Sequence, residues 1–179
     1  MKKIILSLIV MACVAIACAV PQGVGYNGSA ESGARFFISE FDKGGATINP
    51  GGTIEIPAGV DLTFKNEPIQ TIVAKNSPAI TILSYDLEFF SSDPKAVFLT
   101  PFYDLPIYVE VPAGEEAKYE GLPAVFPETI QQFVDATMAD PTLLDQTVAY
   151  RVKMTFHGET EYGYNVKTFF NYALIFGAF

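Results

Sequence analysis

The chain has little with which to build a covalent or metal framework: no tryptophan, one histidine and two cysteines in 179 residues. Cys13 and Cys18 both lie near the start, so no disulfide bond can cross-link the rest of the chain. A structural zinc site uses about four Cys or His ligands and a catalytic one about three, which His157 alone cannot supply. A folded domain in this chain must therefore depend on its apolar core.

Basic residues are also few, with 11 Lys plus Arg against 20 Asp plus Glu and a formal net charge of −9. No basic cluster offers local attraction to phosphate, so nucleic acid is not an expected partner. Charged residues make up only 17% of the chain and hydrophobic residues 50%, which is typical of a folded protein. The length suits one domain with a sizeable core.

The N-terminus has the order of a secretory signal: two lysines, an uncharged apolar run over residues 4–17, then small residues before Pro21. An apolar run of this length would barely cross a hydrocarbon core of roughly 30 Å. These features favour a signal peptide that is removed over a permanent membrane span.

The residues "AIAC", ending at Cys18, resemble the lipobox of bacterial lipoproteins, with Ala15 where Leu is usual. The resemblance implies cleavage before Cys18, lipid attachment to Cys18 and, because Ala19 is not Asp, delivery to the outer membrane. Stable anchoring takes more than one acyl chain, which lipoproteins carry. Three alternatives stay open: cleavage before Cys13 within "VMAC", an ordinary signal peptidase cutting at "ACA", and an uncleaved anchor.

The next residues are rich in Gly, Ser and Asn and have no apolar period, as in a flexible linker. The predicted organisation is thus a lipoprotein signal peptide over 1–17, a flexible tether over 18–34 and one domain over 35–179.

Within that domain, apolar and polar residues alternate in short segments that Gly or Pro interrupts. The expected inward faces are Ile54 and Ile56; Leu62 and Phe64; Leu83, Tyr85, Leu87 and Phe89; and Ile107, Val109 and Val111. A further strand is expected within "IQTIVAK". One-sided alternation predicts antiparallel sheets with one packed face and one wet face.

One segment has helical spacing, from Pro127, which can start a helix, to Asp140-Pro141, which ends it and can begin a further short turn. Its expected apolar face comprises Ile130, Phe133, Val134 and Met138. The stripe predicts a crossover helix that covers one end of the core; docking of a partner is the alternative. Together these features predict an all-β fold, a two-sheet sandwich with one short helical crossover. A transmembrane barrel ending at Phe179 fits less well, because the strands are short and there are 12 prolines.

The last hairpin carries the only histidine. The expected inward residues are Val148, Tyr150, Val152, Met154 and Phe156 on the first strand, and Val166, Phe170, Tyr172, Leu174 and Phe176 on the second. The opposite, polar face is Ala149, Arg151, Lys153, Thr155 and His157. "GETEYG", bounded by Gly158 and Gly163, is the expected turn. Parity thus puts His157 on the polar face at the end of a strand, near an exposed hairpin tip.

The hairpin lacks the further residues that known catalytic and metal-binding motifs require. The "H-x-E" of zinc deaminases needs paired cysteines, which are absent, and no nucleophile elbow is present. Glu159 and Glu161 lack the spacing of a calcium loop. The sequence therefore predicts no catalytic residue, no cofactor and no metal site: the tip is expected to be a surface hairpin, and if it has a role, contact with a partner is favoured over catalysis.

The hairpin pattern "Y-x-V-x-M-x-F-x-G", an acidic turn and "G-x-N-V" is similar to the last hairpin of bacterial lipoproteins with an immunoglobulin-like sandwich, a family of unknown function. "ITILSYDLEF" and "VEVPAGEEAKYEGLP" look like their middle strands. The similarity runs from about Ile54 to Phe176 as a pattern. It implies an immunoglobulin-like antiparallel sandwich in the cell envelope and offers no catalytic residues.

Two classes of function follow. The first is a non-enzymatic, lipid-anchored envelope protein that binds or scaffolds a partner, with the membrane itself held through Cys18. The second is an envelope polysaccharide-binding or hydrolase-accessory protein that uses Tyr103, Tyr162 or Tyr164 and paired carboxylates such as Asp86 and Glu88. The absence of Trp counts against carbohydrate stacking, since Trp has the broadest ring surface.

Overall fold

The computed structural model describes residues 34–42, 44–49, 57, 59–68, 78–143 and 146–177. The predicted signal peptide, the lipid-attachment residue Cys18 and all of the predicted tether except residue 34 lie outside these ranges. The same is true of two expected strand segments, the one with Ile54 and Ile56 and the one within residues 69–75.

The described residues form eight strands, one α-helix and one 3-10 turn. The strands are β1 (Ala34–Phe41), β2 (Gly45–Ile48), β3 (Val60–Pro68), β4 (Ile80–Phe90), β5 (Phe102–Val111), β6 (Glu116–Leu122), β7 (Val148–Thr160) and β8 (Asn165–Phe176). The helix α2 (Pro127–Ala139) and the turn η2 (Pro141–Leu143) connect β6 to β7.

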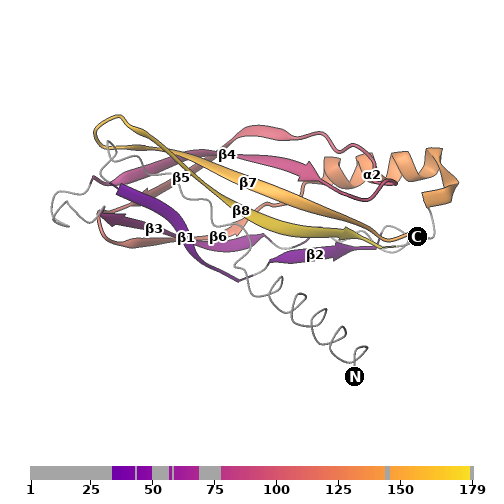
Figure 1. Ribbon diagram of the computed structural model, residues 1–179, viewed down its shortest axis with the longest axis horizontal. Coiled ribbons are helices and arrows are strands. Elements are labelled where there is room, and N and C mark those ends of the chain that lie inside the picture. Colours follow the sequence, from indigo (N-terminus) through magenta and orange to yellow (C-terminus); the bar gives the residue numbers. More distant parts are fainter. Residues whose placement is uncertain are drawn as a thin grey trace, which may run out of the picture.

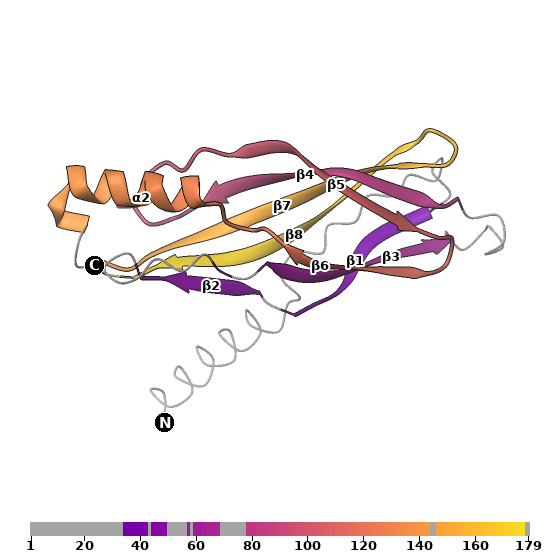
Figure 2. The same cartoon turned by 180° about the vertical axis from the view of Figure 1, so that it is seen from behind.

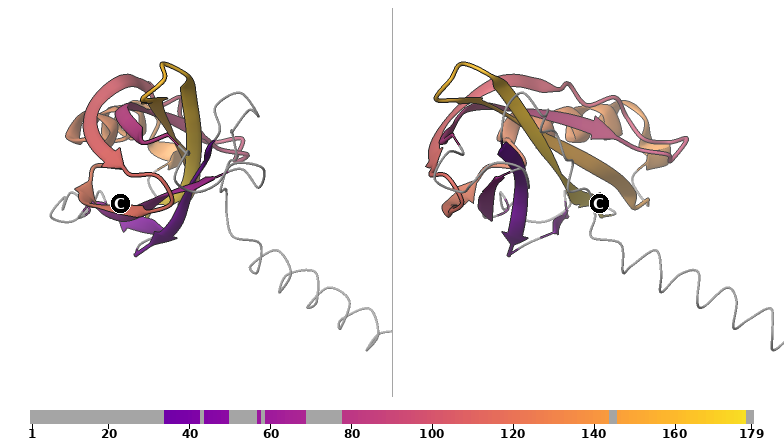
Figure 3. Two further views of the ribbon diagram at one scale, coloured as in Figure 1. Left: turned by 90° about the vertical axis from the view of Figure 1, so that its left-hand side faces the viewer. Right: turned by 60° about the vertical axis from the view of Figure 1, so that its left-hand side comes forward.

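The strands make two sheets, one ordered β1-β3-β6 and the other β2-β8-β7-β4-β5. Neighbouring strands are antiparallel except for β2, which runs parallel to β8. The fold is elongated, with α2 at one end and the β7–β8 turn at the other (Figures 1 and 2). Seen from the end with that turn, the strands of both sheets surround one interior (Figure 3, left). The predicted all-β, two-sheet fold with one short helix is confirmed.

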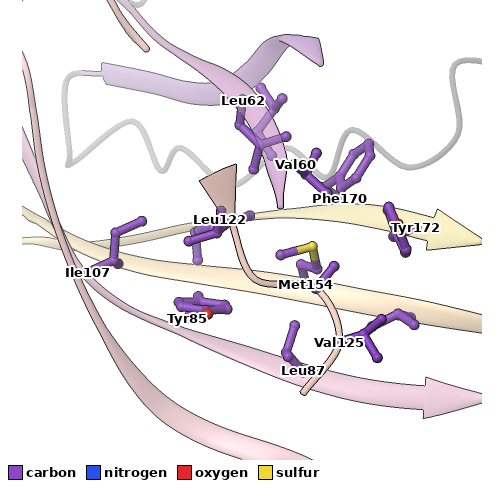
Figure 4. Packing of buried hydrophobic residues seen from close by; sticks show 14 of the residues in the cluster. Val60, Leu62, Tyr85, Leu87, Ile107, Leu122, Val125, Met154, Phe170 and Tyr172 are labelled. Atoms are coloured by element: carbon purple, nitrogen blue, oxygen red, sulfur yellow. The ribbon is translucent and has the colours of Figure 1, made fainter. Parts of the chain in front are cut away.

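The core lies between the sheets and is filled by the inward residues that regular alternation predicted. Figure 4 shows Val60 and Leu62 of β3 together with Met154 of β7 and Phe170 of β8. The residues confirmed as buried are Leu62, Phe64, Tyr85, Leu87, Ile107, Val109, Val111 and all ten of those expected inside the last hairpin.

Three aromatic rings join the two sheets across this core. The Phe64 ring of β3 meets the Phe156 ring of β7 edge-on, with 5.0 Å between centroids. Tyr85 of β4 stacks on the other side of the cluster, 5.9 Å from Phe156. Aromatic pairs in such geometry add about 0.5–1.5 kcal/mol beyond the area they bury.

Leu83 is an exception to the predicted face of β4, since 49% of it is exposed. Ile82 and Ser84 pair with two successive residues of β7, so Leu83 is an extra residue with no partner there. Such a β-bulge shifts the alternation by one position. Residues before it point inward at even numbers, as Ile82 does, and those after it at odd numbers, as Tyr85 and Leu87 do. The prediction for Leu83 was wrong for this reason. Phe89, the last of that set, is only partly buried against the core.

The last hairpin also turns later than expected. Strand β7 continues to Thr160. The Thr160 N–H donates to the carbonyl of Tyr164 across the turn, at 2.9 Å. Gly163, with a φ of 80°, adopts the left-handed conformation that the turn needs. Gly158 instead lies within the strand, where a Cβ would come within 2.7 Å of the Thr81 carbonyl oxygen. Its predicted place at the edge of the loop was therefore wrong.

Helix α2 begins at Pro127 and ends before Asp140, as predicted, and the expected short turn follows. Ile130 and Phe133 are buried, and the Phe133 ring stacks on Phe176 with 4.0 Å between centroids. The helix thus covers one end of the core, as predicted. Met138 was assigned to this face wrongly, because Thr137 takes the inward position and 70% of Met138 is exposed. In the described part of the chain, no helix has the length and apolar character needed to cross a membrane.

Candidate functional site

The outer face of the five-stranded sheet carries the polar residues of the central strands. We call it the polar sheet face and define it by Asp86 and Glu88 of β4, Lys153 and His157 of β7 and Lys167 of β8. Strand alternation brings these side chains to one side, since their neighbours along each strand point into the core. The predicted polar parity of His157 is therefore confirmed. Its predicted position at the strand end was wrong, because three more residues of β7 follow it.

His157 is held by a carboxylate on the neighbouring strand. Its Nε2 lies 2.7 Å from Asp86 Oδ2, and the side chains are 41% and 17% exposed. Because an ionised carboxylate can only accept, the hydrogen of this bond belongs to His157 Nε2. Among the hydrogen bonds of the described residues, none involves the other ring nitrogen, Nδ1. The ring is thus fixed at one nitrogen and available at the other.

The second oxygen of Asp86 is held by a residue in an unusual backbone conformation. The Asp104 N–H donates to Asp86 Oδ1 at 3.0 Å. Asp104 has a φ of 55°, the one positive value among the described non-glycine residues. Asp and Asn enter this region more readily than other residues with a Cβ. Around it the pairing of β4 with β5 shifts register, between Tyr85 and Leu87. A chain of two hydrogen bonds therefore runs from β5 through β4 to the imidazole on β7.

Glu88, the next acid along β4, also faces a basic residue of β7. Lys153 Nζ lies 3.3 Å from Glu88 Oε2 and 5.8 Å from the centre of the Phe169 ring. The two carboxylates considered for glycoside hydrolysis, Asp86 and Glu88, are thus each engaged by a basic side chain. The sheet does not present them as a facing acid–base pair.

A hollow of about 270 Å³ adjoins the imidazole where β7 and β8 pair. We refer to it as the hollow and define it by its lining residues, which are His157, Gly158, Asn165, Val166 and Lys167. Lys167 is the direct cross-strand partner of His157. It belongs to none of the salt bridges found among the described residues.

The tyrosines considered for carbohydrate contact are exposed but lie in two places. Tyr162 and Tyr164 are 62% and 44% exposed in the β7–β8 turn, and the negative charge of Glu161 raises the pKa of Tyr162. Tyr103 is 59% exposed on β5, next to the residue that pairs with Leu87 of β4. The turn adjoins the opposite end of β4, seven residues away, which is roughly 23 Å along a strand. The three rings therefore do not form one stacking platform.

No known protein-family model matches the chain, and no curated protein is similar to it in sequence. The chemistry of the site is therefore inferred from its own residues.

The polar sheet face has an oriented imidazole but no nucleophile bonded to it. Ser84 is the cross-strand partner of His157, yet no hydrogen bond joins the two side chains in the described structure. The residues that the structure describes contain no group of three or more His, Cys, Asp or Glu able to hold a metal ion. Glu161, which follows His157 closely in the sequence, lies in the turn after β7 and not on the polar sheet face. The arrangement offers fixed hydrogen-bonding groups to a ligand.

Three features of the site were missed in the sequence. The pairing of His157 with Asp86 joins residues 71 positions apart, and it follows from the register of β4 on β7. The role of Lys167 depends on the same knowledge for β8. Asp104 carried one weak signal, since Asp near a proline on an edge strand is compatible with a bulge.

Proposed function

We propose that the chain is a lipid-anchored protein of the bacterial cell envelope whose immunoglobulin-like sandwich binds or scaffolds another component, without catalysing a reaction. The lipobox-like residues that end at Cys18 support the anchor, with the outer membrane as the location. The observation that carries the binding role is the hydrogen-bonded chain Asp104–Asp86–His157, which orients a ring beside an open hollow and includes no nucleophile.

The order of the strands supports the immunoglobulin-like assignment. Variable-type immunoglobulin domains have strands A, B and E in one sheet and G, F, C and C′ in the other. Here β1-β3-β6 corresponds to A-B-E, and β8-β7-β4-β5 corresponds to G-F-C-C′. The parallel strand β2 is an addition to that scheme, and α2 occupies the connection from E to F.

The three core aromatics support the same assignment. Antibody domains join strands B and F by a disulfide bond that packs on a tryptophan of strand C. In the proposed correspondence, Phe64 and Phe156 occupy strands B and F, and Tyr85 occupies strand C. The Phe156 ring contacts each of the other two rings. The chain has no tryptophan, and both of its cysteines lie near its start, so aromatic packing takes the place of the disulfide and the tryptophan in the proposed correspondence.

Palmitate labelling tests the anchor. In a bacterial host we expect the wild-type protein to take up label and to fractionate with membranes. Cys18→Ala should lose both properties, and Cys13→Ala, the matched control, should keep them. A Cys18→Ala protein that stays in the membrane without label would refute the lipid anchor.

Crosslinking in intact envelopes tests the binding role. A bound component should be recovered with the wild-type protein and lost with His157→Ala. Met138→Ala changes an exposed residue at the other end of the molecule and should retain it. Equal recovery with all three proteins, or none with any, would count against binding through the polar sheet face.

The polysaccharide-binding alternative is favoured by one observation, the exposure of Tyr162 and Tyr164 in the turn that corresponds to the F–G loop. It gains nothing from Asp86 and Glu88, whose carboxylates are engaged. Retention of the protein on isolated envelope polysaccharide should fall in Tyr162→Ala and Tyr164→Ala and be unchanged in Tyr103→Ala. Unchanged retention in the turn variants would exclude this role for the turn.

A further inference from the structure

We propose that the hollow between β7 and β8 binds an anionic oxygen group of a ligand, a carboxylate or a phosphate, through His157 and Lys167. The proposal rests on the binding function proposed above and names the chemical class that the site accepts. Neither residue is assigned a metal or a catalytic role.

Two successive hydrogen bonds hold His157 in place. The ring nitrogen Nε2 bonds to Asp86 Oδ2, and Asp86 is itself held by the Asp104 N–H, which donates to Oδ1. Asp104 holds its N–H there in a left-handed conformation that residues with a Cβ seldom adopt. Such conformations cluster at binding and active sites, where surrounding contacts maintain them. The chain therefore prepares the ring nitrogen Nδ1 for a ligand.

The charge of Lys167 also favours an anionic ligand. The protein is acidic, with a net charge of −9, and the salt bridges of the described residues give Lys65, Lys118 and Lys153 carboxylate partners. Lys167 has no partner among those salt bridges, although it lines the hollow. An unpaired ammonium carries three N–H donors for an oxyanion.

The acids nearest the hollow have their carboxylates engaged or directed elsewhere. Both carboxylate oxygens of Asp86 accept hydrogen bonds, one from His157 and one from the Asp104 N–H. Glu159, two residues beyond His157, directs Oε1 toward the turn, 3.5 Å from the position of a Cβ on Gly163. The groups that remain for a ligand are Lys167 Nζ, the exposed amide of Asn165 and, when the ring is protonated, the N–H at His157 Nδ1. All three donate.

The size of the hollow limits the ligand. Sites for whole drug-sized molecules start at about 300 Å³, and this one is about 270 Å³. It has room for one acidic sugar residue or for one phosphate group together with the atoms next to it. Sugar acids and phosphates share this chemistry, and direct titration separates them.

The test uses the single histidine as its own probe. In the NMR spectrum of the full-length chain in neutral detergent, the imidazole signals belong to His157 without ambiguity. At a slightly acidic pH, we would titrate oligogalacturonate, inorganic phosphate and a neutral glucose oligomer. A saturable shift with an acidic probe and none with the neutral one is expected. A shift with uronate alone identifies a carboxylate ligand, and a shift with phosphate alone identifies a phosphate.

Lys167→Gln should weaken the binding by about fivefold or more, because it removes the unpaired cation. Lys118→Gln is the control, since that lysine lies on β6 of the other sheet and has Glu120 and Asp61 as partners. It should change the affinity less than twofold. Absence of any saturable shift, an equal shift with the neutral oligomer, or an unaffected Lys167→Gln protein would each overturn the proposal.

Asp86 and Asp104 are positioning residues in this proposal, and the ¹⁵N signals of the ring test them. Asp104→Gly can keep the left-handed conformation and should preserve both the Nε2–H tautomer and the binding. Asp104→Val cannot adopt it easily, and Asp86→Ala removes the acceptor, so both should alter the tautomer signals and weaken binding. Circular dichroism would establish that these variants fold. Unchanged signals and binding in Asp86→Ala would refute the positioning role.

Anchoring is measured separately by palmitate labelling. A protein that is lipidated and crosslinks to a partner, yet gives no ring shift with either anion, would refute the anion site alone. A protein that binds the anion but carries no lipid would refute the anchor alone.

Discussion

Replacing Phe133 by Ala should be among the most destabilising changes that can be made in α2. The ring is 1% exposed, stacks on Phe176 at 4.0 Å between centroids with an interplanar angle of 9°, and meets Tyr150 edge-on at 6.5 Å. These contacts attach the helix to the ends of β7 and β8. Removing the ring leaves a void between the helix and the sheet that the surrounding residues cannot fill completely.

Truncation of a buried Phe to Ala costs about 3–5 kcal/mol, and we expect about 4 kcal/mol for Phe133, the middle of that range. For a chain of this length each kcal/mol lowers Tm by about 2–4 °C, so a fall of about 8–16 °C is expected. Phe133→Leu keeps much of the volume and loses the ring stack, which should cost about 1 kcal/mol. The double variant with Phe176→Ala should reveal a coupling energy of about 0.5–1.5 kcal/mol.

Urea unfolding of the purified protein, followed by circular dichroism, measures these free energies. Met138→Ala is the control, because its side chain is 70% exposed and its loss should change stability by less than about 0.5 kcal/mol. A Phe133→Ala cost below about 1 kcal/mol, or a Met138→Ala cost equal to it, would refute this account. It would mean that α2 presents a different face to the core.

Three further predictions concern the sheets. Gly158→Ala should cost about 1–3 kcal/mol in urea unfolding because its Cβ would be 2.7 Å from a backbone oxygen, whereas Gly44→Ala, with 3.6 Å to the nearest atom, should be neutral or slightly stabilising; equal effects would contradict this. Burial raises the pKa of Tyr85 and of Tyr150 to about 12. Folding therefore keeps both phenols neutral, and the stability this provides, about 2–3 kcal/mol for each, is present below pH of about 10 and lost as pH rises to about 12. Phenolate absorbance should show these two tyrosines ionising later than the exposed ones; titration of all of them together near pH of about 10 would refute the assignment. Leu83→Ser should cost less than about 0.5 kcal/mol because the bulge exposes the residue, and a cost typical of a core leucine would place it inside.

The inward residues of β7 and β8 could be predicted from regular alternation. The same rule gave a wrong prediction on β4, where a β-bulge adds one residue relative to the neighbouring strand. Every expected inward residue from Val148 to Phe156 is buried, because nothing interrupts the pairing of β7 with β8. Leu83 is apolar and lies on the alternation of Tyr85 and Leu87, so its sequence gives no sign of the bulge. The bulge is a property of the pairing with β7, which one segment alone cannot specify.

For the helix, the bounds were predicted correctly and the inward face was predicted only in part. Its limits could be predicted from Pro127 and from Asp140-Pro141, because those signals are local. Which side of its stripe meets the core depends on the strand ends beneath it. Phe176 lies under Phe133, so the inward arc includes Thr137, whose hydroxyl donates to the Phe133 carbonyl at 2.8 Å, and excludes Met138.

The candidate site combines one predictable feature with two that were not. Strand parity predicted that His157 would face outward, and a lone outward histidine carries no chemistry by itself. The register of three strands then brings Asp86 to one side of the ring and Lys167 to the other. Long-range strand pairing is thus what turns a solvated histidine into one that is held in a fixed orientation. Composition and spacing along the sequence do not specify that pairing.

The polar sheet face combines the single histidine of the chain with a neighbouring lysine, Lys167, on the next strand. Elsewhere on the described surface, some lysines have carboxylate partners, as in the ladder of Lys65 with Glu67 and Glu116, whose hydrogen bonds raise the pKa of that lysine. Such exposed ladders contribute little net stability. At the hollow the arrangement differs: Asp86 holds His157 on the outer face of the sheet, and the neighbouring Lys167 belongs to none of the salt bridges of the described residues. An exposed cation beside an imidazole that is held in place is the combination of groups on this face that suits an anionic ligand.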